Sequence, residues 1–130
     1  MSFTGGCLCG QVRYTARAAP ANVRVCHCRL CQKAVGGPFF ARAVFLAGDI
    51  ERSGETTRWA SSSRLDRLSC ARCGTPVFAE PHDDPPRLSV ALATLDEPNA
   101  LAPERHIWVS SKLHWVSLDD GLPQHPERAP

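Results

Sequence analysis

Hydrophobic positions along the chain fall in short runs that are rich in β-branched and aromatic residues, with turn-forming residues between them. These runs cover residues 11–16, 38–45, 57–61, 64–69, 76–79, 87–94 and 107–110. Runs of this length and composition are typical of β-strands. The pattern therefore predicts an all-β domain built from small sheets.

One short helix is predicted within this pattern, over residues 29–35. It is followed directly by Gly36-Gly37-Pro38, a combination that ends helices. Cys31 would then lie near the start of the helix, where the positive end of the helix dipole favours a thiolate over a thiol.

The length of 130 residues fits a single domain, which we place over residues 1–130 with a frayed tail from about residue 124. No stretch approaches the roughly 20 apolar residues that a membrane span needs, and no apolar leader follows Met1. We therefore expect a cytoplasmic protein in a reducing environment, without a membrane partner.

The cysteines are closely spaced and form three clusters: Cys7 and Cys9; Cys26, Cys28 and Cys31; Cys70 and Cys73. A two-residue gap lets neighbouring sulfurs converge on one metal ion. A one-residue gap in extended backbone places two side chains on the same face of a strand. The simplest division joins the first cluster to the last and keeps every cluster intact.

This division predicts two zinc ions per chain. Four thiolates close a tetrahedron around zinc, whereas three leave one position for an outside ligand. Chemistry is therefore expected at the triplet of Cys26, Cys28 and Cys31, and iron is the alternative metal at the four-sulfur site. Extended geometry points His27 away from the sulfurs. A distant histidine can still close the triplet, and the candidates are His82, His106, His114 and His125.

Other uses of the cysteines and of the charge fit the sequence less well. An odd cysteine count and short gaps argue against a disulfide framework. Two zinc ions and seven thiolates would bring the formal net charge from +2 to about −1. No cluster of Lys and Arg with interleaved aromatic residues is present, so we expect no nucleic-acid partner.

Several motifs together resemble those of a known family. They are GGCLCGQVRY at 5–14, CHC at 26–28, CQK at 31–33, GPF at 37–39, CARCGT at 70–75, HIW at 106–108 and DDGLP at 119–123. In this combination the chain resembles the glutathione-dependent formaldehyde-activating enzyme family, which also contains centromere protein V.

The resemblance implies an all-β fold of the β-tent type, stapled by a structural zinc at Cys7, Cys9, Cys70 and Cys73 and a catalytic zinc at Cys26, Cys28 and Cys31. It also implies a carbon–sulfur lyase-type activity, in which the thiol of glutathione adds to formaldehyde and gives S-hydroxymethylglutathione. A small-molecule thiol is then the expected partner.

The ligand set also restricts the chemistry. Zinc bound by three thiolates is a weaker Lewis acid than zinc bound by imidazoles, which favours a substrate thiol over hydrolysis by water. Arg29, Lys33 and Arg42 are candidates to balance the charge, and Arg29 and Lys33 can also receive the carboxylates of a tripeptide thiol. Phe39 or Phe40, but not both, is a candidate for an apolar wall at the open position, and burial in the core is the alternative for these residues.

Two further functions are compatible with the cysteine spacing. One is a non-catalytic zinc module that binds another protein. The other is a thiol redox protein that uses Cys28 and Cys31, although metal would occupy both thiolates. The three tryptophans, Trp59, Trp108 and Trp115, are expected to be anchors of the core.

Overall fold

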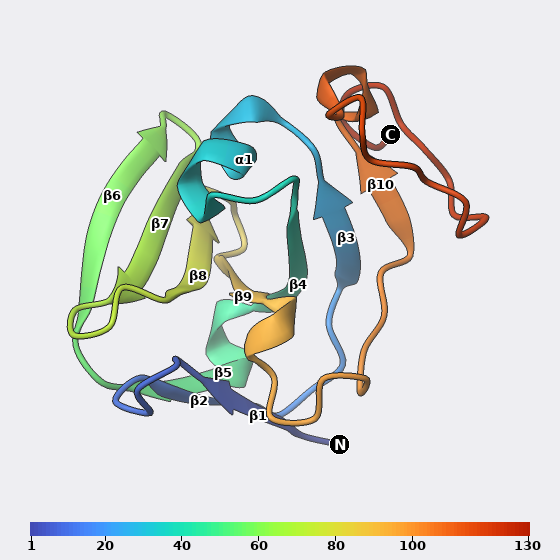
Figure 1. Ribbon diagram of the computed structural model, residues 1–130. Coiled ribbons are helices and arrows are strands. Elements are labelled where there is room, and N and C mark those ends of the chain that lie inside the picture. The colour runs from blue at the N-terminus through green and yellow to red at the C-terminus, as the bar shows by residue number, and fades with distance from the viewer.

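Ten strands in two sheets dominate the computed structural model, which describes residues 1–130 (Figure 1). The strands are β1 (Phe3–Gly6), β2 (Arg13–Ala16), β3 (Asn22–Cys26), β4 (Phe40–Leu46), β5 (Ile50–Ser53), β6 (Thr56–Ser62), β7 (Leu65–Cys70), β8 (Pro76–Pro81), β9 (Arg87–Ala91) and β10 (Arg105–Ile107). The predicted all-β fold of small sheets is confirmed.

Helical structure is confined to α1 (Arg29–Val35) and three short 3-10 turns, η1 (Ala47–Asp49), η2 (Leu92–Thr94) and η3 (Val109–Ser111). The predicted helix over residues 29–35 is therefore confirmed. It ends at Gly36, which adopts a left-handed conformation with φ 65° and donates its N–H to the carbonyl of Gln32. No helix is both long and apolar enough to cross a membrane.

The two sheets differ in their number of strands. The smaller sheet has the order β1-β2-β5, and the larger has the order β10-β3-β4-β9-β8-β7-β6. Neighbouring strands are antiparallel except β10, which runs parallel to β3. Figure 1 shows α1 above the larger sheet, between β3 and the β6–β8 arm, with the smaller sheet across the opposite end.

The main core lies between the two sheets. The larger sheet contributes Phe45, Phe78 and Val90, all nearly fully buried, and the smaller sheet contributes Tyr14 and Ala16. Tyr14 packs edge-on against Phe78 at 5.6 Å between ring centroids, and its hydroxyl lies 2.8 Å from Thr94 Oγ1. Burial raises the pKa of Tyr14 to about 12. This packing stabilises the sheet whose other face carries the cysteine triplet.

A second, smaller hydrophobic cluster lies on that other face. Its buried members are Cys26, Cys31, Phe40, Ala79, Ala91 and Ile107. Because side chains alternate along strands, Phe40 on β4 faces this cluster while Phe45 faces the main core. The helix α1 and the C-terminal segment cover this side of the sheet.

The C-terminal segment differs from the frayed tail that we expected from about residue 124. Gln124 forms a bridge with His106, and the Trp108 N–H donates to the carbonyl of Glu127 at 2.9 Å. The strand predicted over 107–110 is also displaced, because β10 ends at Ile107 and Trp108 takes a left-handed conformation with φ 57°. This turn lets the tail pair with β10.

Two of the three tryptophans are not core residues, contrary to prediction. Trp59 on the edge strand β6 is 75% exposed, and Trp115 is 73% exposed. Trp108 is half-buried and packs against the second cluster. An exposed aromatic on an edge strand has the same sequence signature as a buried one, so the pattern alone could not separate them.

Candidate metal centres

Four cysteines meet where the two sheets approach each other. Their sulfurs, from Cys7, Cys9, Cys70 and Cys73, all lie within 4.8 Å of one another. Two of the separations are 3.6 Å, between Cys7 and Cys9, and 3.8 Å, between Cys9 and Cys70. Tetrahedral zinc with bonds of about 2.3 Å requires sulfur–sulfur distances of roughly 3.8 Å. The four-sulfur cluster therefore fits a tetrahedral metal ion.

Backbone turns hold these sulfurs and donate hydrogen bonds to them. The N–H of Val12 lies 3.2 Å from Cys7 Sγ, and the N–H groups of Arg72 and Cys73 lie 3.4 and 3.5 Å from Cys70 Sγ. The hydroxyl of Thr75, 3.1 Å from Cys73 Sγ, lowers the pKa of Cys73 to about 5. These contacts favour the thiolate, the form that binds metal.

The local geometry at the first pair differs from the extended strand that we predicted. Cys7 and Cys9 follow β1 in a tight turn, in which the Gly10 N–H donates to the Cys7 carbonyl at 3.1 Å. Gly10 has φ 83°, a conformation that favours glycine. The turn, and not strand alternation, brings the two sulfurs together.

The other three cysteines converge at the junction of β3 and α1. Cys26 ends β3, Cys28 caps the helix, and Cys31 lies in the first turn, with its N–H 3.4 Å from Cys28 Sγ. All three sulfurs lie within 4.8 Å of one another. This triplet therefore also has the geometry to bind a metal ion.

Ionisation of one thiol in the triplet opposes ionisation of the next. Hydrogen bonds from Cys26 and Cys31 lower the pKa of Cys28 to about 2. The pKa of Cys26 is raised well above its usual range, first by its contacts with Cys28 and Cys31 and then by burial. Three thiolates at such distances require a nearby cation, and a bound metal ion would supply one.

No histidine joins the triplet as a fourth ligand. His106, the strongest candidate from sequence, is buried with its Nδ1 2.9 Å from His27 Nε2 and its Nε2 2.7 Å from Asp120 Oδ2. His82 Nδ1 lies 2.9 Å from the carbonyl of Ser63. The group at α1 that could hold a metal ion thus consists of three sulfurs. A tetrahedral ion bound by these three alone would have one coordination position left for an outside ligand.

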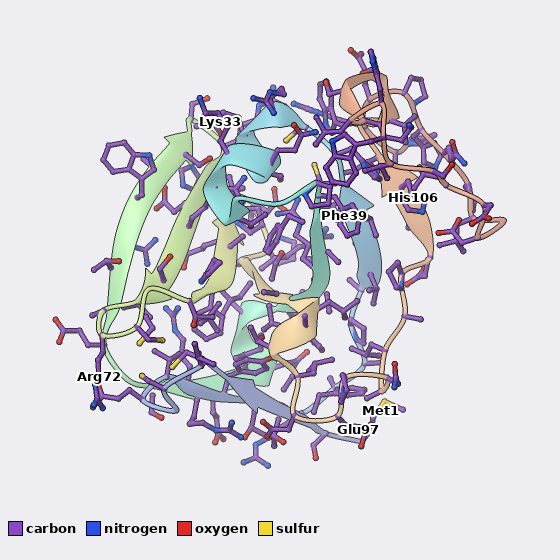
Figure 2. The ribbon with its side chains drawn as sticks, in the orientation of Figure 1. Met1, Lys33, Phe39, Arg72, Glu97 and His106 are labelled. Carbon is purple, nitrogen blue, oxygen red and sulfur yellow. The ribbon has the colours of Figure 1, made fainter.

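The His27–His106 pair links the triplet segment to β10 and the tail. His27 is fully buried, and burial, followed by the nearby His106, lowers its pKa to about 4. Its ring also packs edge-on against Phe39 at 5.4 Å between centroids. Figure 2 shows Phe39 and His106 on the side of the molecule where β3 and β10 meet.

Two arginines supply positive charge at the triplet. Arg67 on β7 directs Nη2 to Cys31 Sγ at 3.3 Å and places its guanidinium over the Phe40 ring at 5.7 Å. Arg42 on β4 is only 8% exposed. Burial lowers the pKa of Arg42, and the nearby Cys31 and Cys26 oppose that shift. Arg67 was missed in the sequence because its approach depends on the pairing of β7 in the folded sheet.

The other predicted substrate residues lie on the outer side of α1. Arg29 and Lys33 are exposed and line a shallow hollow together with Pro38 and Trp115. Arg29 also donates to Gln32 Oε1. Lys33 projects from α1 in Figure 2. The structure therefore brings Arg29 and Lys33 together, and it places Arg42 separately within the sheet.

A cavity of about 300 Å³ adjoins the triplet on the side of β6 and β7. It is lined by Phe40 and Arg67, which reach the cysteines, and by Ala34, Trp59 and Phe78 among others. This volume is at the lower end of the range for small-molecule sites. The cavity can therefore hold a small ligand beside Arg67, whose guanidinium contacts Cys31 Sγ.

Comparison with known proteins identifies the family. The family model for the glutathione-dependent formaldehyde-activating enzyme matches residues 2–111. The chain belongs to this family. The resemblance inferred from the cysteine motifs is therefore confirmed, and the β-tent type of fold follows with it.

Two relatives carry related names. A protein of Halomonas elongata, provisionally named a glutathione-dependent formaldehyde-activating enzyme, is 25% identical over 131 residues, which cover 92% of this chain and 82% of that protein. A Schizosaccharomyces pombe protein named as an uncharacterized lyase is 28% identical over 76 residues. That match covers 58% of this chain and 56% of the yeast protein, little more than half of either.

A solved structure shares the fold of this family member. The crystal structure of a Rhodobacter sphaeroides protein superposes with a TM-score of 0.60 at 21% sequence identity. The superposition covers 77% of this chain and 97% of the other. At this identity the likeness supports the fold alone.

Proposed function

We propose that the chain is a zinc-dependent enzyme of the carbon–sulfur lyase type that acts on the adduct of a small thiol and a small carbonyl compound. Glutathione and formaldehyde are the nominal pair, as the family and the names of its relatives suggest. The observation that carries the proposal is the difference between the two clusters, because four sulfurs saturate one metal ion and three leave a position open. We assign the structural zinc to the first cluster and the catalytic zinc to the second.

Zinc at Cys26, Cys28 and Cys31 would supply a coordination position that favours a soft thiolate. Adding the negative charge of a substrate thiolate to a zinc ion that already has three cysteine thiolates is costly in a partly buried environment unless cations lie near. Arg67, at 3.3 Å from Cys31 Sγ, and the buried Arg42 provide those cations. Phe40, which is buried in the same hydrophobic cluster as Cys26 and Cys31, provides an apolar wall at this site.

The proposed reaction is an addition that balances without an oxidant or reductant. A carbon–sulfur bond forms between the thiol sulfur and the carbonyl carbon, and the carbonyl oxygen gains the proton that the thiol loses. The reverse reaction breaks the same bond and releases the carbonyl compound. Placing the sulfur beside Cys31 and the carbonyl compound in the 300 Å³ cavity would favour the attack by proximity.

The test compares zinc content with exchange catalysis. Wild type is expected to bind about two zinc ions per chain and to accelerate exchange between labelled formaldehyde and S-hydroxymethylglutathione, measured by ¹³C exchange NMR. The double variant C28S/C31S is expected to keep about one zinc and to return to the uncatalysed rate. Wild type with two zinc ions but no acceleration would reject this activity and leave the protein-binding zinc module.

A second variant tests the role of charge at the open position. Arg67→Gln is expected to retain both zinc ions and to lower the exchange rate by roughly tenfold, because a charged hydrogen-bond donor to Cys31 is lost. Arg17→Gln serves as the control, because Arg17 is exposed directly after β2 and pairs with Glu51 on β5. Equal rates for the two variants would remove Arg67 from the proposal.

A further inference from the structure

A second cavity next to the triplet is unusually rich in arginine. It has a volume of about 340 Å³ and lies between the C-terminal tail and the face of the larger sheet that carries the second hydrophobic cluster. Five of its lining residues are arginines and one is an aspartate: Arg24, Arg42, Arg64, Arg87, Arg128 and Asp83. The cavity wall therefore carries a formal charge of about +4, unlike the nearly neutral chain as a whole.

The strand register forces like charges together at this wall. Arg24 on β3 lies directly opposite Arg42 on β4, and Arg105 on β10 lies on the other side of Arg24. Opposed like charges destabilise a sheet. An arrangement with this cost calls for a compensating anion.

Hydrogen-bond donors on the same face lack acceptors. Nε of Arg24, Nε and Nη1 of Arg42, Nε of Arg87 and Oγ of Ser89 are all buried without a hydrogen-bond partner. Arg42, which is more than nine-tenths buried, lines the cavity. None of these arginines forms a salt bridge with Asp or Glu. Buried donors are normally satisfied in proteins, so this set indicates an acceptor from outside the chain.

The cavity is next to the cysteine triplet. Leu65, Trp108 and Ala129 line it and also pack against the hydrophobic cluster that contains Cys26 and Cys31. Arg24 precedes Cys26 by two residues on β3, so both side chains face the same side of the sheet. The cavity wall therefore shares residues with the hydrophobic cluster that contains Cys26 and Cys31.

We propose that this cavity binds a compact oxyanion with more than one negative charge, of the phosphate class. Arginine forks suit tetrahedral oxyanions because each guanidinium can donate two parallel hydrogen bonds. Glutathione, with two carboxylates and one ammonium group, has a net charge of about −1, which is small compared with the formal charge of the cavity wall. The anion is either free or carried by the thiol that binds at the triplet, and only the latter alternative rests on the proposed function.

The first test is phosphate binding by the zinc-loaded full chain, measured by calorimetry at constant ionic strength. Wild type is expected to bind inorganic phosphate saturably with one site per chain. The double variant R24Q/R87Q is expected to bind at least tenfold more weakly, while the exposed-site control Arg17→Gln binds as wild type does. Absence of saturable binding by wild type, or equal binding by R24Q/R87Q, would overturn the proposal.

Thermal unfolding of the single variant Arg24→Gln provides a second measurement. Without added phosphate, this variant is expected to unfold at a higher temperature than wild type, because the repulsion with Arg42 and Arg105 is removed. Phosphate should raise the unfolding temperature of wild type more than that of the variant. Equal shifts, or a variant less stable than wild type without phosphate, would contradict the site.

Competition distinguishes the two sources of the anion. If the cavity receives part of the thiol substrate, inorganic phosphate should weaken binding of 2-mercaptoethyl phosphate but not of 2-mercaptoethanol. If the anion is free, phosphate should affect neither thiol. Failure of the proposed function would appear separately, as wild type without exchange activity that still binds phosphate.

Discussion

Gln32 provides a sharp test of how α1 is fixed beside the candidate metal centre. Its side chain is 3% exposed, and its amide donates to the carbonyl of His27 at 2.7 Å and to that of Ser111 at 3.0 Å. Gln32→Leu preserves most of the volume and removes both donors. Leaving the buried carbonyl of His27 without its hydrogen-bond partner costs about 1–3 kcal/mol, and the same loss at the half-buried carbonyl of Ser111 costs less. We expect a total loss of about 2–4 kcal/mol in the free energy of unfolding.

The assay is urea unfolding at a fixed free zinc concentration, because zinc binding adds to the apparent stability. Gln11→Leu is the matched control, since the Gln11 side chain is exposed and makes no hydrogen bond. Its effect should stay within about 0.5 kcal/mol. A loss below that value for Gln32→Leu, at unchanged zinc content, would refute the view that this amide fixes the helix against β3 and η3.

Two further predictions concern the sheets. Asp96 accepts hydrogen bonds from Arg13 and then Thr4, which lower its pKa to about 2, below the unfolded value of about 3.9. Its contribution to stability is therefore present above about pH 4 and lost as the pH falls toward 2. In thermal unfolding, the difference in stability between wild type and Asp96→Asn should therefore shrink over that range. A difference that stays constant would contradict the ion pair. Phe45→Ala, at a fully buried core position, should cost about 3–5 kcal/mol in urea unfolding, whereas Leu46→Ala at the neighbouring exposed position should cost far less. Similar losses at both positions would disprove the assigned faces of β4.

Local signals in the sequence were sufficient for the helix and for the cysteine grouping. The helix over residues 29–35 depends on Gly36 and on a cap at Cys28, both within one turn of its ends. The cysteines group correctly because each cluster is held by a short turn or by the β3–α1 junction. Such features depend on neighbouring residues, and spacing records them directly.

Features that depend on strand pairing were not predictable in this way. β1, with two glycines, and β3, with alternating polar residues, were missed because each gains its stability from its partner strands. The opposition of Arg24 and Arg42 depends on the register of β3 with β4, which lie on either side of α1. Arg67 approaches Cys31 across 36 residues of sequence. No local pattern in the sequence places Arg24 beside Arg42, or Arg67 beside Cys31.

The two cysteine clusters also differ in what they connect, and this difference supports the separate roles that we propose for them. Cys9 and Cys70, 3.8 Å apart, are separated by 61 residues, so a metal ion there joins the turn after β1 to the end of β7 and closes a long loop. Closing such a loop restricts the unfolded chain substantially. The triplet lies within six consecutive residues, so a metal ion there would close only a very short loop. Loss of metal from the triplet should therefore affect chemistry more than folding, which is why C28S/C31S is a usable variant, whereas the same change at Cys70 and Cys73 is expected to unfold the protein.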